Sequence, residues 1–168
     1  MKVIAFAAAA LALSGAAALA QPFEGKGSVQ GWNIFFNGKT GGCFMEGQQG
    51  DYVVQMGTEA AMLGQGDGDI FGFVAVYAPA EIALKDGEML PIFVSIDGEL
   101  FGGDVVGVEK QGFHGGYVIS NSTEYADALS DGSVMTIAPD TPSATEISLS
   151  GTRAAIDAVR GCQAETAG

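Results

Sequence analysis

Cysteine, histidine and basic residues are all scarce in this chain of 168 residues. It has two cysteines, Cys43 and Cys162, a single histidine, His114, and seven Lys plus Arg against twenty Asp plus Glu, for a net charge of −13. Two distant cysteines and one histidine lack the ligand spacing of a zinc site. A surface this acidic repels nucleic acid and anionic lipid, so neither is expected as a partner.

The N-terminal segment has the layout of a secretory signal peptide. Lys2 precedes a long apolar stretch, and Ala18-Leu19-Ala20 forms an A-x-A cleavage site. An N-terminal membrane anchor is the alternative, but the stretch is Ala-rich, is interrupted by Ser14-Gly15 and has no basic flank after it. We therefore predict a signal peptide over residues 1–20, cleaved after Ala20, and a periplasmic or secreted protein with no membrane span after processing.

The remaining residues, 21–168, are predicted to form one domain. This length suits a single hydrophobic core, and removal of Lys2 leaves six basic against twenty acidic residues, a net charge of −14. Glycine is abundant, with 26 residues, yet 48% of the chain is hydrophobic, which excludes a disordered composition. The glycines stand between short apolar runs and indicate turns.

The two cysteines are predicted to form one disulfide, because cysteines in exported proteins usually pair. Two free thiols and a metal-binding pair are the alternatives. A Cys43–Cys162 bond would close a loop of about 120 residues and stabilise the fold by up to about 4–5 kcal/mol.

Short runs with alternating or continuous apolar residues predict a series of strands separated by turn signals. The clearest is the run 70–77, apolar on both faces and therefore predicted to be a central strand. The other predicted strands are 31–36, 51–56, 90–96, 104–110, 116–120, 133–138 and 145–150. Many strands and few helices indicate a mainly β fold: an antiparallel β-sandwich or a partly open barrel with two short helices.

Two helices are expected in the second half of the chain. The first lies in 121–132, with Asn121 or Ser122 as N-cap and Gly132 as its end. The second begins near Thr152, which is expected to cap it, and carries an apolar stripe of Ala155, Ile156 and Val159. Gly161 is expected to end it, so that Cys162 would join a closing helix to the first hairpin.

Candidate catalytic and metal-binding residues are few. His114 has no G-x-S-x-G nucleophile to serve, so we interpret it as a structural residue between glycines. Asp67 and Asp69 lie in a glycine-rich loop that lacks the remaining ligands of a calcium loop. Asp97, Glu99 and Asp104 are interpreted in the same way. No catalytic, cofactor or metal site is predicted.

The order of these segments resembles the invasion-associated locus B family. The similarity lies in a Trp strand followed by a cysteine, "GWNIFF…GGCF", in "VYAPAEIALKDGEMLPIFVSIDG" and "GFHGGYVIS", and in a helix and strand followed by "ISLSGTRAAIDAV". The family often has cysteines in the Trp strand and in a later loop. Here Phe36 stands near the first position, and residues 114–117 contain no cysteine. The resemblance implies a small exported β-rich protein, with members linked to host-cell invasion.

These observations predict a non-enzymatic envelope or secreted protein that binds another molecule. The acidic surface favours a cationic partner, such as a basic secreted enzyme that this protein would inhibit, or an envelope or host-surface component. The alternatives are a periplasmic hydrolase that uses carboxylates with His114, and a structural envelope component. A deep pocket around His114 and two acids would favour the hydrolase.

Overall fold

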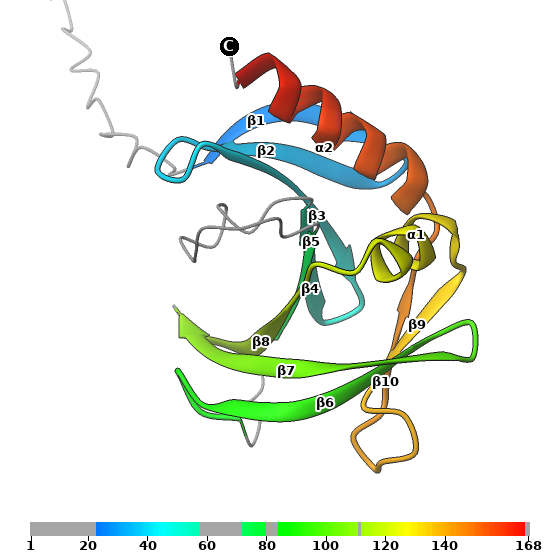
Figure 1. Ribbon diagram of the computed structural model, residues 1–168. Helices are drawn as coiled ribbons and strands as arrows, with labels where there is room; N and C mark the ends of the chain where they lie inside the picture. Colours follow the sequence, from blue (N-terminus) through cyan, green and yellow to red (C-terminus); the bar gives the residue numbers. More distant parts are fainter. Residues whose placement is uncertain (1–22, 58–71, 80–83, 111, 167–168) are drawn as a thin grey trace, which may run out of the picture.

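The computed structural model describes residues 23–57, 72–79, 84–110 and 112–166 (Figure 1). The predicted signal peptide with Ala20, and the loop with Asp67 and Asp69, lie outside the described residues. The elements are β1 (Phe23–Val29), β2 (Trp32–Asn37), β3 (Gly42–Gln49), β4 (Tyr52–Gly57), β5 (Gly72–Ala78), β6 (Met89–Ile96), β7 (Glu99–Lys110), β8 (Phe113–Ser120), α1 (Thr123–Asp131), β9 (Val134–Ile137), β10 (Thr145–Ser148) and α2 (Thr152–Thr166).

The strands form one antiparallel sheet of ten, in the order β1-β2-β3-β4-β5-β8-β7-β6-β9-β10. The sheet curls so strongly that β10 approaches the strands near its other edge, but it does not close into a barrel (Figure 1). The predicted mainly β fold is therefore confirmed, in its partly open form. The run predicted as a central strand is β5, which has five strands on one side and four on the other and is buried over most of its length.

Inward-facing residues of the curled sheet, together with both helices, form the main core. Strand periodicity places Trp32 and Ile34 of β2, Met45 of β3, and Val54 and Met56 of β4 on the concave face, where all are buried. Helix α2 packs over β1, β2 and β3 (Figure 1), and its Ala155, Ile156 and Val159 belong to the same core. The predicted apolar stripe is confirmed.

A second apolar cluster lies on the convex face. It contains the buried residues Phe44, Phe73, Ala75 and Tyr117, with Phe35, Tyr77 and other partly buried side chains packed against them. The Phe35 and Phe44 rings stack with their centroids 5.4 Å apart. Both faces of the central strands are thus apolar, which is why β5 reads as a continuous apolar run.

Helix α1 follows the predicted boundaries. The Ser122 hydroxyl accepts a hydrogen bond from the Tyr125 backbone N–H at 3.2 Å, so Ser122 rather than Asn121 is the N-cap. Gly132 ends the helix and donates its N–H to the Ala128 carbonyl at 2.8 Å.

Helix α2 differs from the prediction at both ends. It continues through Gly161 to Thr166, because Cys162 and Gln163, which follow the glycine, are held to Cys43 of β3. The Thr152 hydroxyl does not accept the capping bond expected of it. It is buried, and its single hydrogen is shared between the Leu129 and Leu149 carbonyls, 2.8 and 2.7 Å from its oxygen, which ties the start of α2 to α1 and to the residue after β10.

Candidate functional site

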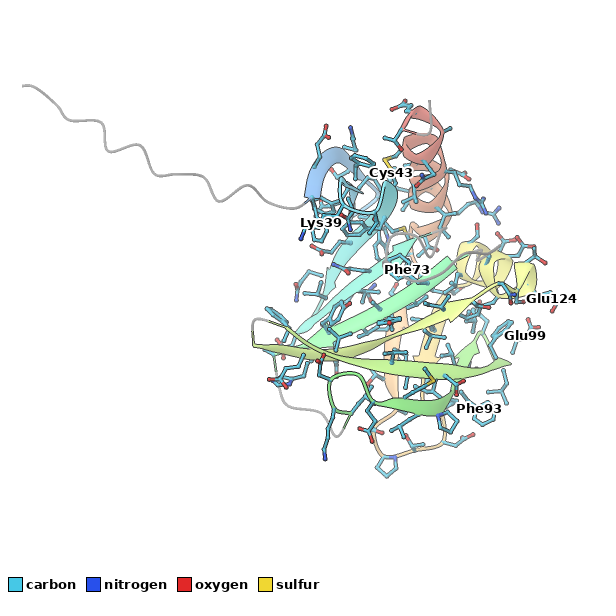
Figure 2. The ribbon with its side chains drawn as sticks, turned by 60° about the vertical axis from the view of Figure 1, so that its left-hand side comes forward. Lys39, Cys43, Phe73, Phe93, Glu99 and Glu124 are labelled. Carbon is cyan, nitrogen blue, oxygen red and sulfur yellow. A yellow bond between two sulfur atoms is a disulfide. The ribbon has the colours of Figure 1, made fainter. Side chains whose placement is uncertain are left out.

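One end of the curled sheet is held closed by covalent and polar contacts to α2. Cys43 of β3 and Cys162 of α2 form a disulfide with Cα atoms 6.1 Å apart, a normal separation for such a bond. The Gln163 side chain accepts a hydrogen bond from the Cys43 N–H and donates one to the Gly41 carbonyl, both at 2.9 Å. Figure 2 shows Cys43 beside α2, far from Phe93 on β6.

We call this region the filled end, defined by Trp32, Ile34, Met45, Val54 and Met56. Each of these side chains is at most 4% exposed. These large inward residues pack with Ala155, Ile156 and Val159 of α2 in one core. The Trp32 indole N–H also donates to the Ser150 carbonyl at 3.0 Å, which joins β2 to the loop before α2.

The opposite part of the concave face encloses a cavity of about 400 Å³. We call it the hollow end and define it by five of the inward aliphatic residues that line it: Val76, Ile92, Val105, Val118 and Ile137. Each of them is only half-buried, although all face the interior of the sheet. The same concave surface is therefore densely packed at one end and contains a cavity at the other.

The hollow arises because the inward residues there are small and because α2 packs over β1, β2 and β3 instead. Between Phe101 and Glu109 on β7, and between His114 and Ser120 on β8, the inward positions hold only valine and glycine, including Gly107 and Gly116. A Cβ on Gly107 would lie 2.0 Å from the Lys85 carbonyl oxygen. Glycine is therefore required where the Lys85 backbone lies against β7. Leu84 lies against Gly116 and lines the cavity. These small inward residues were a sequence signal of the cavity that strand patterns alone did not reveal.

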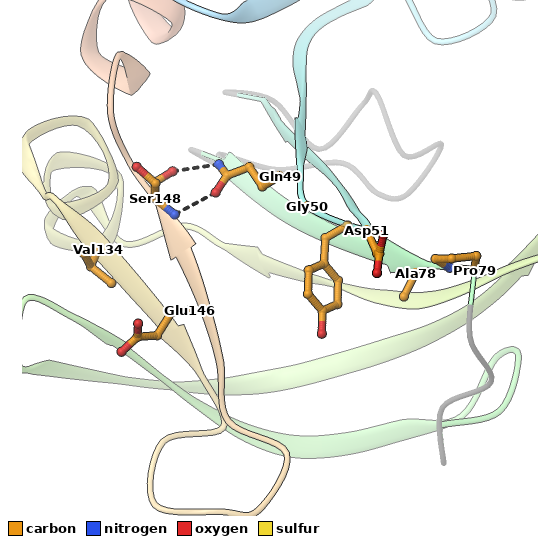
Figure 3. Close-up of a pocket in the computed structure, with 9 residues that line it drawn as sticks. Gln49, Gly50, Asp51, Ala78, Pro79, Val134, Glu146 and Ser148 are labelled. Carbon is orange, nitrogen blue, oxygen red and sulfur yellow. Dashed lines mark hydrogen bonds between the residues drawn. The ribbon is translucent and has the colours of Figure 1, made fainter.

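The hollow end opens beside β10. Tyr52 and Ala78 line both the interior cavity and a surface hollow of about 580 Å³, which also includes Gln49, Asp51 and Glu146 (Figure 3). The polar residues of the interior cavity include Ser143 and Thr145, which precede or begin β10. The cavity thus combines an aliphatic interior with a polar opening.

Tyr125 of α1 stands between two hollows. It lines the interior cavity and a smaller one of about 260 Å³, and its ring centroid lies 5.2 Å from that of Phe101. Burial raises the pKa of Tyr125, and no described residue forms a hydrogen bond with its hydroxyl. An unpaired buried hydroxyl costs about 1–3 kcal/mol, so this wall of the cavity is not optimised for stability.

The candidate residues from the sequence do not come together. His114 lies on β8 and lines the interior cavity. Its neighbours in the strand register are Ala78 of β5 and Glu109 of β7. Asp97 lies in the β6–β7 turn and accepts hydrogen bonds from the Ser133 and Val134 N–H groups, at 2.8 and 3.0 Å. Its carboxylate therefore has a structural role.

The other acidic candidates give no metal centre among the residues that the structure describes. Glu99 and Asp104 are exposed on β7, and within the described ranges no three His, Cys, Asp or Glu residues gather as metal ligands. Neither α1 nor α2, the helices of the described part, is long and apolar enough to cross a membrane.

Comparison with known proteins shows a shared fold. No family model matches the chain, and no curated protein matches it in sequence. A solved structure, that of invasion associated protein B from Bartonella henselae, is similar with a TM-score of 0.53 and 16% sequence identity, over 84% of this chain and 98% of that chain. At this identity the likeness establishes the fold, and the family resemblance seen in the sequence is supported to that extent.

Proposed function

We propose that this protein is an exported binding protein whose ligand-binding site is the hollow end of its open barrel. The observation that carries the proposal is the cavity of about 400 Å³, lined by half-buried aliphatic side chains in a protein whose other end is fully packed. Binding sites for small ligands are typically apolar cavities of about 300–1,000 Å³ with a few polar groups.

The lining determines what the site can hold. Half-buried aliphatic side chains such as Ile92 and Val118 favour apolar groups, because covering them removes apolar surface from water. The described lining contains no Asp, Glu, Lys or Arg side chain. The interior therefore suits the uncharged, apolar part of a ligand, and any charged group belongs at the opening.

The disulfide is compatible with export, and the acidic composition favours a partner with positive charge. The printed name of the structural neighbour associates that protein with invasion. We extend this to the present chain as a proposed role at the host interface, supported by the common fold.

The test is titration with Nile red, a neutral dye that fluoresces in apolar sites. The wild-type protein is expected to bind it, and Ile92→Trp, which places a larger side chain in the cavity, is expected to weaken binding about tenfold, the effect of about 1.4 kcal/mol. The matched control is Phe93→Trp, the next residue on β6, which is 62% exposed on the other face.

Thermal unfolding of both variants checks that they fold. If wild-type protein does not bind the dye, or if the two variants bind it equally well, the hollow end is not the binding site.

A further inference from the structure

Where β10 approaches the end of β3, a side chain of β3 forms the hydrogen bonds that a neighbouring strand would form. The Gln49 amide Nε2 donates to the Ser148 carbonyl and its Oε1 accepts from the Ser148 N–H, both at 2.8 Å (Figure 3). A backbone residue of a neighbouring antiparallel strand would form the same pair of bonds. We call the gap between the edge of β10 and the end of β3, bridged here by Gln49, the seam.

Among the described residues, the backbone N–H and C=O of Glu146, two residues before Ser148, are free to bind a neighbouring strand. One edge of β10 pairs with β9. On the same edge, the Leu149 N–H donates a hydrogen bond to the Ser133 carbonyl. Because backbone groups alternate along a strand, the N–H and C=O of Glu146 point the same way as those of Ser148, into the seam. No described residue forms a hydrogen bond with the Glu146 backbone on this side.

The seam is wide enough for more than a direct strand contact. Paired strands lie about 4.8 Å apart, whereas here an entire glutamine side chain and its hydrogen bonds span the gap. Next to Gln49 the seam widens into the surface hollow of about 580 Å³, which contains Asp51 and Glu146. Through Tyr52 and Ala78 this hollow adjoins the interior cavity.

We propose that the seam binds an extended peptide segment, which pairs with the β10 edge and completes the open sheet. The inference rests on the proposed function, since alternate side chains of the segment would enter the hollow end. A strand supplies a donor and an acceptor to the free Glu146 groups and, on displacing the Gln49 amide, the same pair to Ser148, which a small ligand does not. Its outward side chains face the carboxylates of Asp51 and Glu146, so the partner is an extended segment that alternates apolar with basic residues.

The probe is a short blocked peptide of alternating valine and lysine, titrated against the full protein by calorimetry. We expect binding, and we expect a matched peptide N-methylated on alternate residues to bind about tenfold more weakly, because it loses backbone donors. This comparison uses the wild-type protein and does not depend on the folding of any variant.

Two variants test the β10 side. Glu146→Pro removes the N–H that faces the seam, a change that edge strands tolerate, and should weaken peptide binding about tenfold. Glu146→Gln removes only the charge and should weaken it less, with a smaller salt dependence. Gln49→Ala frees the Ser148 position and should strengthen binding, whereas Gln48→Ala, whose amide donates to the Gly50 carbonyl, should not change it.

The outcomes separate the two proposals. Nile red binding that survives Glu146→Pro, together with loss of peptide binding, supports both. If the dye binds but the peptides bind equally with and without N-methylation, the strand proposal fails and the cavity proposal stands. If sedimentation shows that the free protein is a dimer that Glu146→Pro dissociates, the occupant is a second copy of this chain and the peptide proposal is wrong.

Discussion

The filled end and the hollow end are parts of one continuous concave surface, yet they differ in nearly every respect. At the filled end Trp32, Ile34 and Met45 are buried beneath α2. At the hollow end the inward valines border an open cavity. The disulfide between Cys43 and Cys162 and the hydrogen bonds of Gln163 all join α2 to the filled end.

This difference separates stability from binding within one sheet. A small open barrel cannot pack its entire interior and also keep a cavity, so covalent and helical contacts at one end compensate for the missing core at the other. We therefore expect changes at the filled end to alter unfolding with little effect on ligands, and changes at the hollow end to do the reverse.

The largest expected effect is that of removing the disulfide. The double variant Cys43→Ala, Cys162→Ala should lose about 4 kcal/mol of unfolding free energy, because the bond spans 119 positions of the chain. Urea unfolding measures the loss. In folded protein the affinity for Nile red should be unchanged, and a parallel loss of dye binding would show that the two ends are not independent.

Truncating one inward isoleucine at each end compares the two directly. Ile34→Ala, at a filled-end residue that is only 4% exposed, should cost about 3 kcal/mol because it creates a new void. Ile92→Ala, at a residue that already borders the cavity, should cost about 1 kcal/mol, chiefly the loss of partly buried apolar surface. Equal losses in urea unfolding would mean that the hollow end is packed in solution.

The last prediction concerns the convex face, on the other side of the same strands. Burial, with smaller contributions from Tyr117 and Glu46, raises the pKa of Tyr77 to about 12, against about 10 in an unfolded chain. The neutral phenol therefore adds stability below pH 10, and this contribution, roughly 2 kcal/mol, is lost as the pH rises toward 12.

Unfolding as a function of alkaline pH measures that loss. Tyr77→Phe cannot ionise and should show a shallower decline than wild-type protein between pH 10 and 12. Superimposable pH profiles would contradict a buried position for Tyr77 and would indicate that the convex cluster is solvated.

Local patterns were sufficient to predict most of the strands and both helices. The Asp97-Gly98 turn, for example, has φ angles of 47° and 94°, as its residue types suggest. β1 was missed because its glycines and charged residues suppress the apolar alternation, and its residues Glu24 to Ser28 are exposed. β3 was missed because "GCFMEGQQ" is buried on both faces at its start and contains two glycines, so it shows no clear period.

The end of α2 and the site depend on contacts between distant parts of the chain. Gly161 is a normal stop signal, but Gln163 and Cys162 hold the following turn against Cys43 of β3. The small inward residues of β7 and β8 are a sequence signal of the cavity, but they do not locate it, because the cavity also depends on the curvature of the whole sheet. Valines such as Val105 and Val118 have the same pattern whether they face a packed core or an open one.

The most direct test of the separation between the two ends is the ratio of Nile red affinities in Ile92→Trp and Phe93→Trp. These neighbouring residues differ in the face of β6 they occupy. A ratio of about ten, with similar unfolding temperatures, is the predicted result. A ratio of one would contradict the account, because it would mean that the concave face of the hollow end binds nothing.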